Sequence, residues 1–283
     1  MTASTTAGLV TAARRSGRGI AAFNVITLEH AEAITAAADA AGLPVILQIS
    51  ENAVAFHGGR PAPVLAAALA LADAAAVPVA VHLDHVQDED LLQSGIAAGV
   101  SSVMYDASAL PYEQNVRATA RVASWAHSHG VWVEAELGAV GGKDGAHAPG
   151  VRTDPDQAAA FTTATGVDAL AVAVGSSHAM TLRTARLDHA LIARLRTSVA
   201  VPLVLHGSSG VPDDELRQAV TAGMVKINIG TALNVAFTSA VRGHLAADRD
   251  VVDPRRYLRT ARDAMTATTR HLLQVVSRAS SPS

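Results

Sequence analysis

The sequence predicts an α/β fold in which a single (β/α)8 barrel, or TIM barrel, is followed by a C-terminal helical extension. Eight short apolar runs recur along the 283 residues at an average interval of about 29 residues. Segments with helical spacing, rich in Ala and Leu, separate these runs. No G-x-G-x-x-G motif follows the first run, which favours a closed barrel over an open doubly wound sheet.

The apolar runs are rich in Val, Ile and Leu, as expected of parallel strands that are buried on both faces. They span residues 19–25, 44–50, 78–85, 102–108, 131–137, 169–175, 202–207 and 225–230. The helical segments between them span residues 28–41, 63–76, 89–98, 111–129, 155–165, 188–197 and 212–222. Pro or a capping residue begins several of these helices and Gly ends several. We expect one domain over residues 1–283, with the barrel at about 17–247 and the extension, with one helix after DPRRYLR, at about 248–283.

Composition excludes several classes of protein. Aromatic residues make up 3% of the chain and the net charge is −3, so we expect no nucleic-acid partner. The absence of Cys excludes disulfides and thiolate chemistry. No apolar stretch long enough for a membrane span is present, and none of the kind found in a signal peptide follows Arg14 and Arg15. We therefore expect a cytoplasmic protein without a membrane partner.

Polar residues gather at the predicted carboxyl ends of the strands, where the active sites of such barrels lie. The histidines among them that stand at three different strand ends are His85, His178 and His206. Three imidazoles would suit Zn²⁺ and leave one coordination position open. Isolated histidines that contact only their neighbours are the alternative.

Two carboxylates and several further histidines need separate interpretations. Asp84 adjoins His85, where it could either move a proton or orient a ligand histidine. His82 shares the strand parity of Asp84, which favours either a packing role or a supporting role behind a metal ligand. The histidines on predicted helices are expected at the surface, and they are His30, His127, His129, His189, His244 and His271.

Three loops are candidates for substrate contacts. HGSSG (206–210) and NIGT (228–231) follow the last two strands, where barrels often bind phosphate through backbone N–H groups. The Gly-rich connection at residues 137–155 is either a lid that brings Lys143 or Asp144 to the site or a solvated loop.

Together these residues resemble the class II, metal-dependent ketose-bisphosphate aldolases, the fructose- and tagatose-bisphosphate aldolase family. The resemblance runs from AFNV (22–25) to DPRRYLR (253–259) and rests above all on HLDH (82–85), VEAELGAVGG (133–142), GSSHA (175–179) and LHGSSG (205–210). It implies cleavage or formation of the C3–C4 bond of a ketose 1,6-bisphosphate, through a zinc-stabilised enediolate. The products of cleavage are dihydroxyacetone phosphate and an aldehyde.

The resemblance also implies roles for single residues. Zn²⁺ would be held by His85, His178 and His206, and Asp84 would act as the acid/base. Asp106 and Glu136 match positions that hold a displaced or second metal in relatives. The implied substrate-binding residues are Asn24, Ser50, Ala179, Gly207, Ser208, Ser209, Asn228, Ile229, Gly230, Thr231 and Arg255. Arg255 would reach the second phosphate, in its own or a neighbouring subunit. The family further implies a monovalent cation (Na⁺ or K⁺) and a homodimer or homotetramer.

The sequence departs from the family pattern at four places, one of which is that Ala232, Leu233 and Asn234 lack the Glu commonly found after Thr231. Asp144, after Lys143, is the nearest carboxylate where relatives carry a Glu that protonates the enediolate. Ala179 replaces a Gly beside the phosphate, and Gly230 replaces the Asp or Ala that separates fructose-type from tagatose-type members. These departures leave two alternatives open. One is a specialised aldolase for a modified ketose phosphate such as 6-phospho-5-keto-2-deoxygluconate, and the other is a non-catalytic sugar-phosphate binder.

A class I aldolase, which needs a Schiff-base lysine, is a further alternative. Lys143 and Lys226 are the only lysines of the chain, and only Lys226 lies on a predicted strand. This alternative leaves the three histidines at the strand ends without a role.

Overall fold

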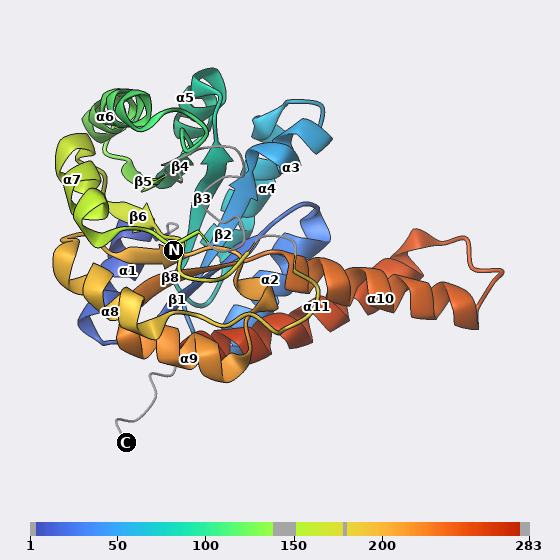
Figure 1. Cartoon of the computed structure of the whole chain (residues 1–283). Coiled ribbons are helices and arrows are strands. Elements are labelled where there is room, and N and C mark those ends of the chain that lie inside the picture. The colour runs from blue at the N-terminus through green and yellow to red at the C-terminus, as the bar shows by residue number, and fades with distance from the viewer. Residues whose placement is uncertain (1–3, 138–150, 178–179, 278–283) are drawn as a thin grey trace.

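The structure is a computed structural model that describes residues 4–137, 151–177 and 180–277. Within them, eight parallel strands close into a barrel in chain order, because β8 pairs with both β7 and β1 (Figure 1). The strands are β1 Ile20–Asn24, β2 Val45–Ser50, β3 Val79–Val86, β4 Ser102–Tyr105, β5 Trp132–Glu136, β6 Ala169–Ala171, β7 Leu203–Leu205 and β8 Met224–Ile229. The predicted fold class is confirmed.

Helices surround the barrel and pack on the outward faces of its strands. Those between successive strands are α2 Leu28–Ala41, α4 Pro61–Ala74, α5 Glu89–Ala97, α6 Tyr112–Ser128, α7 Pro155–Thr165, α8 His189–Ser198 and α9 Asp213–Ala222. Their bounds differ from the predicted ones by at most two residues. Sequence analysis missed the short helices α1 Thr6–Arg15, α3 Glu51–Phe56 and η1 Ser208–Gly210. Among the described helices, none combines the length and apolar character that a membrane crossing needs.

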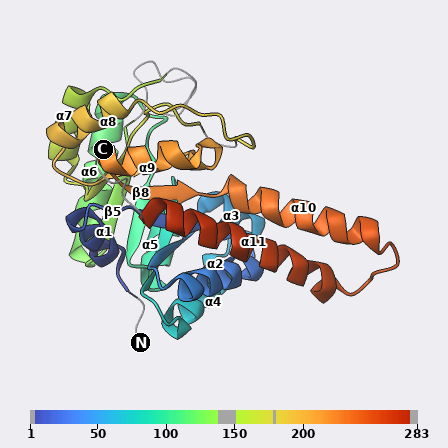
Figure 2. The same ribbon diagram turned by 90° about the horizontal axis from the view of Figure 1, so that it is seen from below.

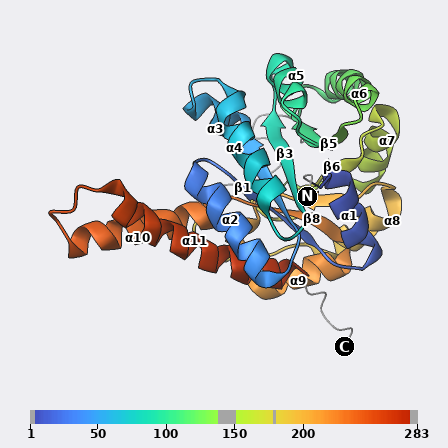
Figure 3. The ribbon, with the colours of Figure 1, turned by 180° about the vertical axis from the view of Figure 1, so that it is seen from behind.

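The first helix, α1, covers the amino-terminal ends of the strands (Figure 3). The Ser102 hydroxyl at the start of β4 donates to Thr6 Oγ1 at 2.6 Å, and the Ser4 N–H donates to the carbonyl of Val79 at the start of β3. Leu9 and Val10 pack against apolar side chains at this end of the barrel interior. The opposite end, where the strands finish, is left for the site.

The last two helices, α10 Thr231–Ala247 and α11 Pro254–Ser277, form an antiparallel pair that projects from the barrel (Figures 1 and 2). α11 returns along α10 and packs against α9, α2 and β1. The Gly19 N–H before β1 donates to the Val276 carbonyl at 3.2 Å. α11 therefore fills the place in the outer layer between α9 and α2, although it lies in the segment predicted as an extension. It begins at Pro254 and so includes most of DPRRYLR instead of following it.

His30 corrects one of the surface predictions. It is only 4% exposed, and its ring stacks on Phe237 of α10 with the centroids 5.6 Å apart. Its Nδ1 lies 3.1 Å from the Thr27 hydroxyl at the start of α2. The surface prediction was wrong because the sequence pattern does not show that α10 and α11 cover this face of α2.

The barrel interior is polar at the level below the strand ends. Gln48, His82, Glu134 and Lys226 are all 0% exposed. His82 Nδ1 lies 2.7 Å from the Ser102 hydroxyl at the start of β4. A barrel of this kind is filled by side chains in layers, so these polar groups support the residues above them.

The packing of α11 predicts its contribution to stability. Met265 is fully buried in the main core. We expect Met265→Ala to lower the free energy of unfolding by about 2–5 kcal/mol. Val252→Ala is the control, because Val252 is 90% exposed, and we expect a change below about 0.5 kcal/mol. Urea unfolding of both variants measures the difference, and equally small effects would mean that α11 is no part of the barrel wall.

Candidate active site

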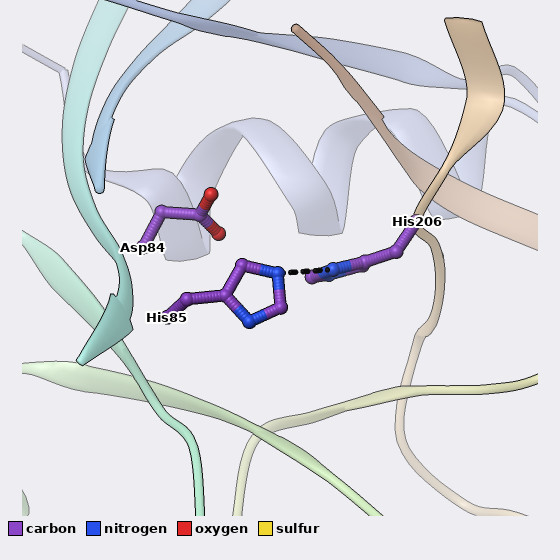
Figure 4. Close-up of side chains that lie close together, drawn as sticks. All are labelled: Asp84, His85 and His206. Atoms are coloured by element: carbon purple, nitrogen blue, oxygen red, sulfur yellow. Dashed lines mark hydrogen bonds between the residues drawn. The ribbon is translucent and has the colours of Figure 1, made fainter. Parts of the chain in front are cut away.

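A backbone irregularity turns two neighbouring side chains of β3 toward the site. Successive residues of a regular strand point to opposite faces. The pairing of β3 with β4 shifts register between Leu83 and Val86, and His85 has a φ of 50°. Positive φ is uncommon for a residue other than Gly and carries strain. This local distortion places Asp84 and His85 together at the mouth of the barrel (Figure 4).

His85 and His206 face each other across the mouth of the barrel (Figure 4). His206 Nδ1, just after β7, lies 2.9 Å from His85 Nε2. The other ring nitrogen of each histidine faces a carboxylate, because His85 Nδ1 is 2.8 Å from Asp106 and His206 Nε2 is 2.9 Å from Glu134. A carboxylate behind an imidazole is typical of histidines that bind a metal, since it fixes the ring and its tautomer.

The donor atoms in the described residues fit a metal ion. One group comprises Asp84, His85 and His206, and a second comprises His85, Asp106 and Glu136; within each, the candidate ligand atoms lie within 4.8 Å of one another. Imidazole nitrogens with neighbouring carboxylates suit Zn²⁺. The predicted third histidine, His178, lies outside the described residues.

The Asp84 carboxylate is 2% exposed and lies beside both histidines. Amide nitrogens of Asn24 and Asn228 donate to its two oxygens, each at 3.4 Å. The Gln48 amide holds Asn24 in turn, donating to its Oδ1 at 2.6 Å. Burial raises the pKa of Asp84, although the positive charges of His85 and Lys226 oppose this. A carboxylate in this environment is a stronger base than one in water.

His85 lies in a strongly negative environment. Burial lowers its pKa, but the charges of Asp84, Glu136 and Asp106 and the hydrogen bond to Asp106 outweigh burial and raise the pKa to about 10. Burial likewise opposes ionisation of Asp106, yet His85 and the Ser108 hydroxyl hold the Asp106 pKa well below its usual range. The cluster therefore attracts a cation, either a proton or a metal.

The predicted phosphate loops adjoin each other at the ends of β7 and β8. The Ser208 hydroxyl donates to the Asn228 carbonyl, and the Ala232 N–H donates to Ser209 Oγ at 3.1 Å. A cavity of about 290 Å³ lies beside them, and its lining includes Ser208, Ser209 and Ile229. Gly230 and Thr231 form the N-terminus of α10, whose partial positive charge favours anions.

Two glycines of these loops lie where other groups approach their backbone closely. Gly207 has a φ of 66°, and a Cβ on it would lie 2.5 Å from the carbonyl oxygen of Ser177. A Cβ on Gly230 would lie 3.2 Å from the amide of Asn24. The Gly at position 230 thus leaves room for Asn24 where it contacts Asp84.

The structure does not bring every predicted site residue to this place. Ser50 does lie beside Asp84 in the pairing of β2 with β3, where its hydroxyl caps α3 by accepting from the Ala53 N–H at 3.2 Å. Arg255 lies at the far end of the α10–α11 pair, where it is bound to Asp253 at 2.7 Å (Figure 1). Lys143, Asp144 and Ala179 lie outside the described residues.

Sequence analysis gave no role in the metal site to Glu134 and Lys226. Lys226 Nζ donates to Glu134 Oε2 and to Asn228 Oδ1, each at 2.8 Å. The strand parity shared by Lys226 and Asn228 was the available signal, since it points both side chains inward. Because Lys226 is fully buried and ion-paired, it offers no support for Schiff-base chemistry.

Comparisons with known proteins agree with this geometry. The family model for class-II fructose-bisphosphate aldolase matches residues 4–281. The chain is 42% identical to the fructose-bisphosphate aldolase of Geobacillus stearothermophilus and 40% identical to the probable fructose-bisphosphate aldolase of Bacillus subtilis. These matches cover 90% of both chains for the first relative and 92% for the second.

Solved structures show the same fold over nearly the whole chain. The YdjI aldolase from Escherichia coli K12 superposes with a TM-score of 0.85 at 31% identity and covers 98% of each chain. A putative fructose-1,6-bisphosphate aldolase from Coccidioides immitis gives a TM-score of 0.83 at 26% identity, covering 96% of this chain and 95% of that one. With its site at the barrel mouth, the chain belongs to the class II fructose-bisphosphate aldolase family and is an aldolase, a lyase of carbohydrate metabolism.

Proposed function

We propose that the protein is a zinc-dependent aldolase that cleaves and forms the C3–C4 bond of a ketose 1,6-bisphosphate of the fructose or tagatose type. Dihydroxyacetone phosphate and an aldehyde are the products of cleavage. The observation that carries the proposal is the approach of His85 Nε2 and His206 Nδ1 to 2.9 Å beside the buried Asp84. The names of the relatives support the substrate class.

His85, His206 and, by the family resemblance, His178 would hold the Zn²⁺. Asp106 and Glu136 offer a second position, shared with His85. Zn²⁺ bound there would act as a Lewis acid that stabilises the negative charge developing on the oxygens of the ketone half. Asp106 and Glu134 keep the two described histidine rings in place.

Asp84 is the residue that moves the proton of the C4 hydroxyl. In cleavage its carboxylate takes this proton as the C3–C4 bond breaks, and in condensation it returns the proton to the aldehyde oxygen. Asn24 and Asn228 orient both oxygens of the carboxylate. The raised pKa of Asp84, caused by burial, suits a group that must both accept and release a proton.

The loops after β7 and β8 bind the phosphate of the dihydroxyacetone-phosphate half. Backbone N–H groups from Gly207 to Ser209 and from Ile229 to Thr231 are the donors, together with the N-terminus of α10. Asn24 and Ser50 contact the sugar from the β1 and β2 side. Ala179 and a monovalent cation, Na⁺ or K⁺, complete this end of the site by resemblance to the family.

A second subunit supplies Arg255 for the other phosphate. Arg255 lies on the projecting α10–α11 pair, away from the mouth of its own barrel (Figure 1). Its side chain is 85% exposed and so is accessible to a neighbouring copy. Along α10, Val235 and Leu245 are exposed apolar side chains. These features support a homodimer or homotetramer, and we place the enzyme in the cytoplasm.

Asp144 delivers the proton to the enediolate carbon in this proposal. It stands where the family carries a longer carboxylate, and it remains a prediction from the sequence alone. If this shorter side chain changes the reaction, we expect one of two outcomes. The protein would turn over a modified ketose phosphate, or it would bind a sugar phosphate without turnover.

His206→Ala removes one predicted ligand and leaves the buried Glu134 without its histidine. We expect the variant to lose bound zinc and aldolase activity together. Elemental analysis after dialysis and a cleavage assay measure both. His127→Ala on α6 is the matched control, because His127 is 39% exposed and pairs with Asp168. Zinc retained at full occupancy in His206→Ala would contradict the assignment.

Asp84→Ala tests the proton-transfer role. We expect the variant to keep its zinc and to lose about 10²–10⁴-fold in kcat, the usual contribution of a general base. Asp84→Asn keeps the shape of the side chain and should lose a similar factor. A variant that retained full turnover would show that another group carries the proton.

The substrate is tested by coupling release of dihydroxyacetone phosphate to a reporter dehydrogenase. Fructose 1,6-bisphosphate, tagatose 1,6-bisphosphate and 6-phospho-5-keto-2-deoxygluconate are compared with and without added Zn²⁺. We expect zinc-dependent cleavage of at least one of the two bisphosphates. Cleavage of the third compound alone would indicate the specialised aldolase, and binding without cleavage would indicate the non-catalytic relative.

A further inference from the structure

Two oppositely charged side chains lie in the barrel interior beneath His206. Glu134 on β5 and Lys226 on β8 are both 0% exposed, and Lys226 Nζ donates to Glu134 Oε2 at 2.8 Å. β5 and β8 are not neighbours in the barrel, so the ion pair crosses its interior. Charged groups are almost never fully buried unless paired, and here the second carboxylate oxygen contacts His206.

The contacts of His206 determine which ring nitrogen carries the proton. Nε2 lies 2.9 Å from Glu134 Oε1, whereas Nδ1 faces His85 Nε2 at 2.9 Å. A carboxylate accepts hydrogen bonds and cannot donate them when ionised, so Nε2 is the protonated nitrogen. Asn228 Nδ2 also lies 2.9 Å from Nε2, but both nitrogens carry hydrogen in this tautomer, so the Asn228 amide donates to Asp84 Oδ1 at 3.4 Å.

We propose that Glu134 and Lys226 are positioning residues of the metal site: Glu134 keeps the His206 proton on Nε2, and Lys226 keeps Glu134 in place. The lone pair of His206 Nδ1 then points at the position between the two histidines. This inference rests on the metal site of the proposed function.

His85 shows why the lysine is needed at one histidine and not at the other. His85 has the same kind of partner, Asp106, but that pair lies at the rim with side-chain exposures of 26% and 11%. His206 and Glu134 are both fully buried. A single carboxylate at that depth would lack solvation, and Lys226 supplies the compensating charge from β8, across the barrel interior.

The two donors that meet Glu134 predict the effect of an amide there. Lys226 Nζ and His206 Nε2 both donate, and the carboxylate offers an oxygen to each. A glutamine has one oxygen and one NH₂ group, so one of the two donors would face another donor. When that donor is His206, the proton moves to Nδ1 and blocks the metal-binding atom.

Zinc affinity is the readout that tests the role, measured by competition with a chromogenic chelator on the full-length protein. We expect Glu134→Gln to raise the Kd for Zn²⁺ by about 10–100-fold, the usual effect of removing the partner of a ligand histidine. ¹⁵N chemical shifts of the histidines in the zinc-free variant should show a smaller Nε2-protonated population at His206.

A double variant separates positioning from stability. In Glu134→Gln/Lys226→Met the buried charge is balanced, so we expect thermal stability near that of the wild type. We expect its zinc affinity to remain at least about tenfold weaker, because an amide oxygen is a weaker acceptor than a carboxylate. If Glu134→Gln alone does not fold, the zinc affinity of this double variant tests the inference.

Glu32→Gln is the matched control. It removes a carboxylate that pairs with Arg262 at 2.7 Å between α2 and α11, remote from the site, and should leave the Kd for Zn²⁺ unchanged. If Glu134→Gln or the double variant bound Zn²⁺ within about twofold of the wild-type affinity, this inference would be overturned and the proposed function would stand. A wild-type protein that binds no Zn²⁺ would overturn the metal site of the proposed function and this inference with it.

Discussion

The buried ion pair between Lys226 and Glu134 is the interaction on which the arrangement of the site depends. Removing one partner of such a pair commonly costs about 3–5 kcal/mol, because the other charge is left without solvation. The pair also helps to fix the positions of other side chains. Glu134 contacts His206, and Lys226 contacts Asn228, whose amide donates to Asp84. The proposed metal ligand His206 and the proposed base are thus tied to one buried contact across the barrel interior.

The irregularity in β3 is the second constraint, and it explains how the proposed metal ligand and the proposed base can be consecutive residues. A regular strand would send either Asp84 or His85 into the surrounding helices. A residue held at positive φ costs on the order of 1–3 kcal/mol, which the contacts of His85 with Asp106 and His206 offset. The strained residue is therefore His85, next to Asp84, where the proposed metal ligand and the proposed base lie side by side.

The regular recurrence of apolar runs predicts the fold. The polar residues at the ends of these runs predict where the site lies. Strand parity shows that Lys226 faces inward, but not that it reaches the level of Glu134 on the opposite side. The register shift after Leu83 has no sequence signal that we identified. The burial of His30 depends on how two distant helices return to the barrel, which local periodicity does not encode.

The charges of the site bear on how it would attract an anionic substrate. Lys226 is neutralised by Glu134, so it contributes little net positive charge to an incoming phosphate. Asp84, Asp106 and Glu136 surround His85, and their charges raise its pKa to about 10 despite burial. A divalent cation held between the histidines, as proposed, would offset these negative charges for an incoming phosphate. In the proposed enzyme the metal would therefore favour binding of the anionic substrate as well as supply its chemistry.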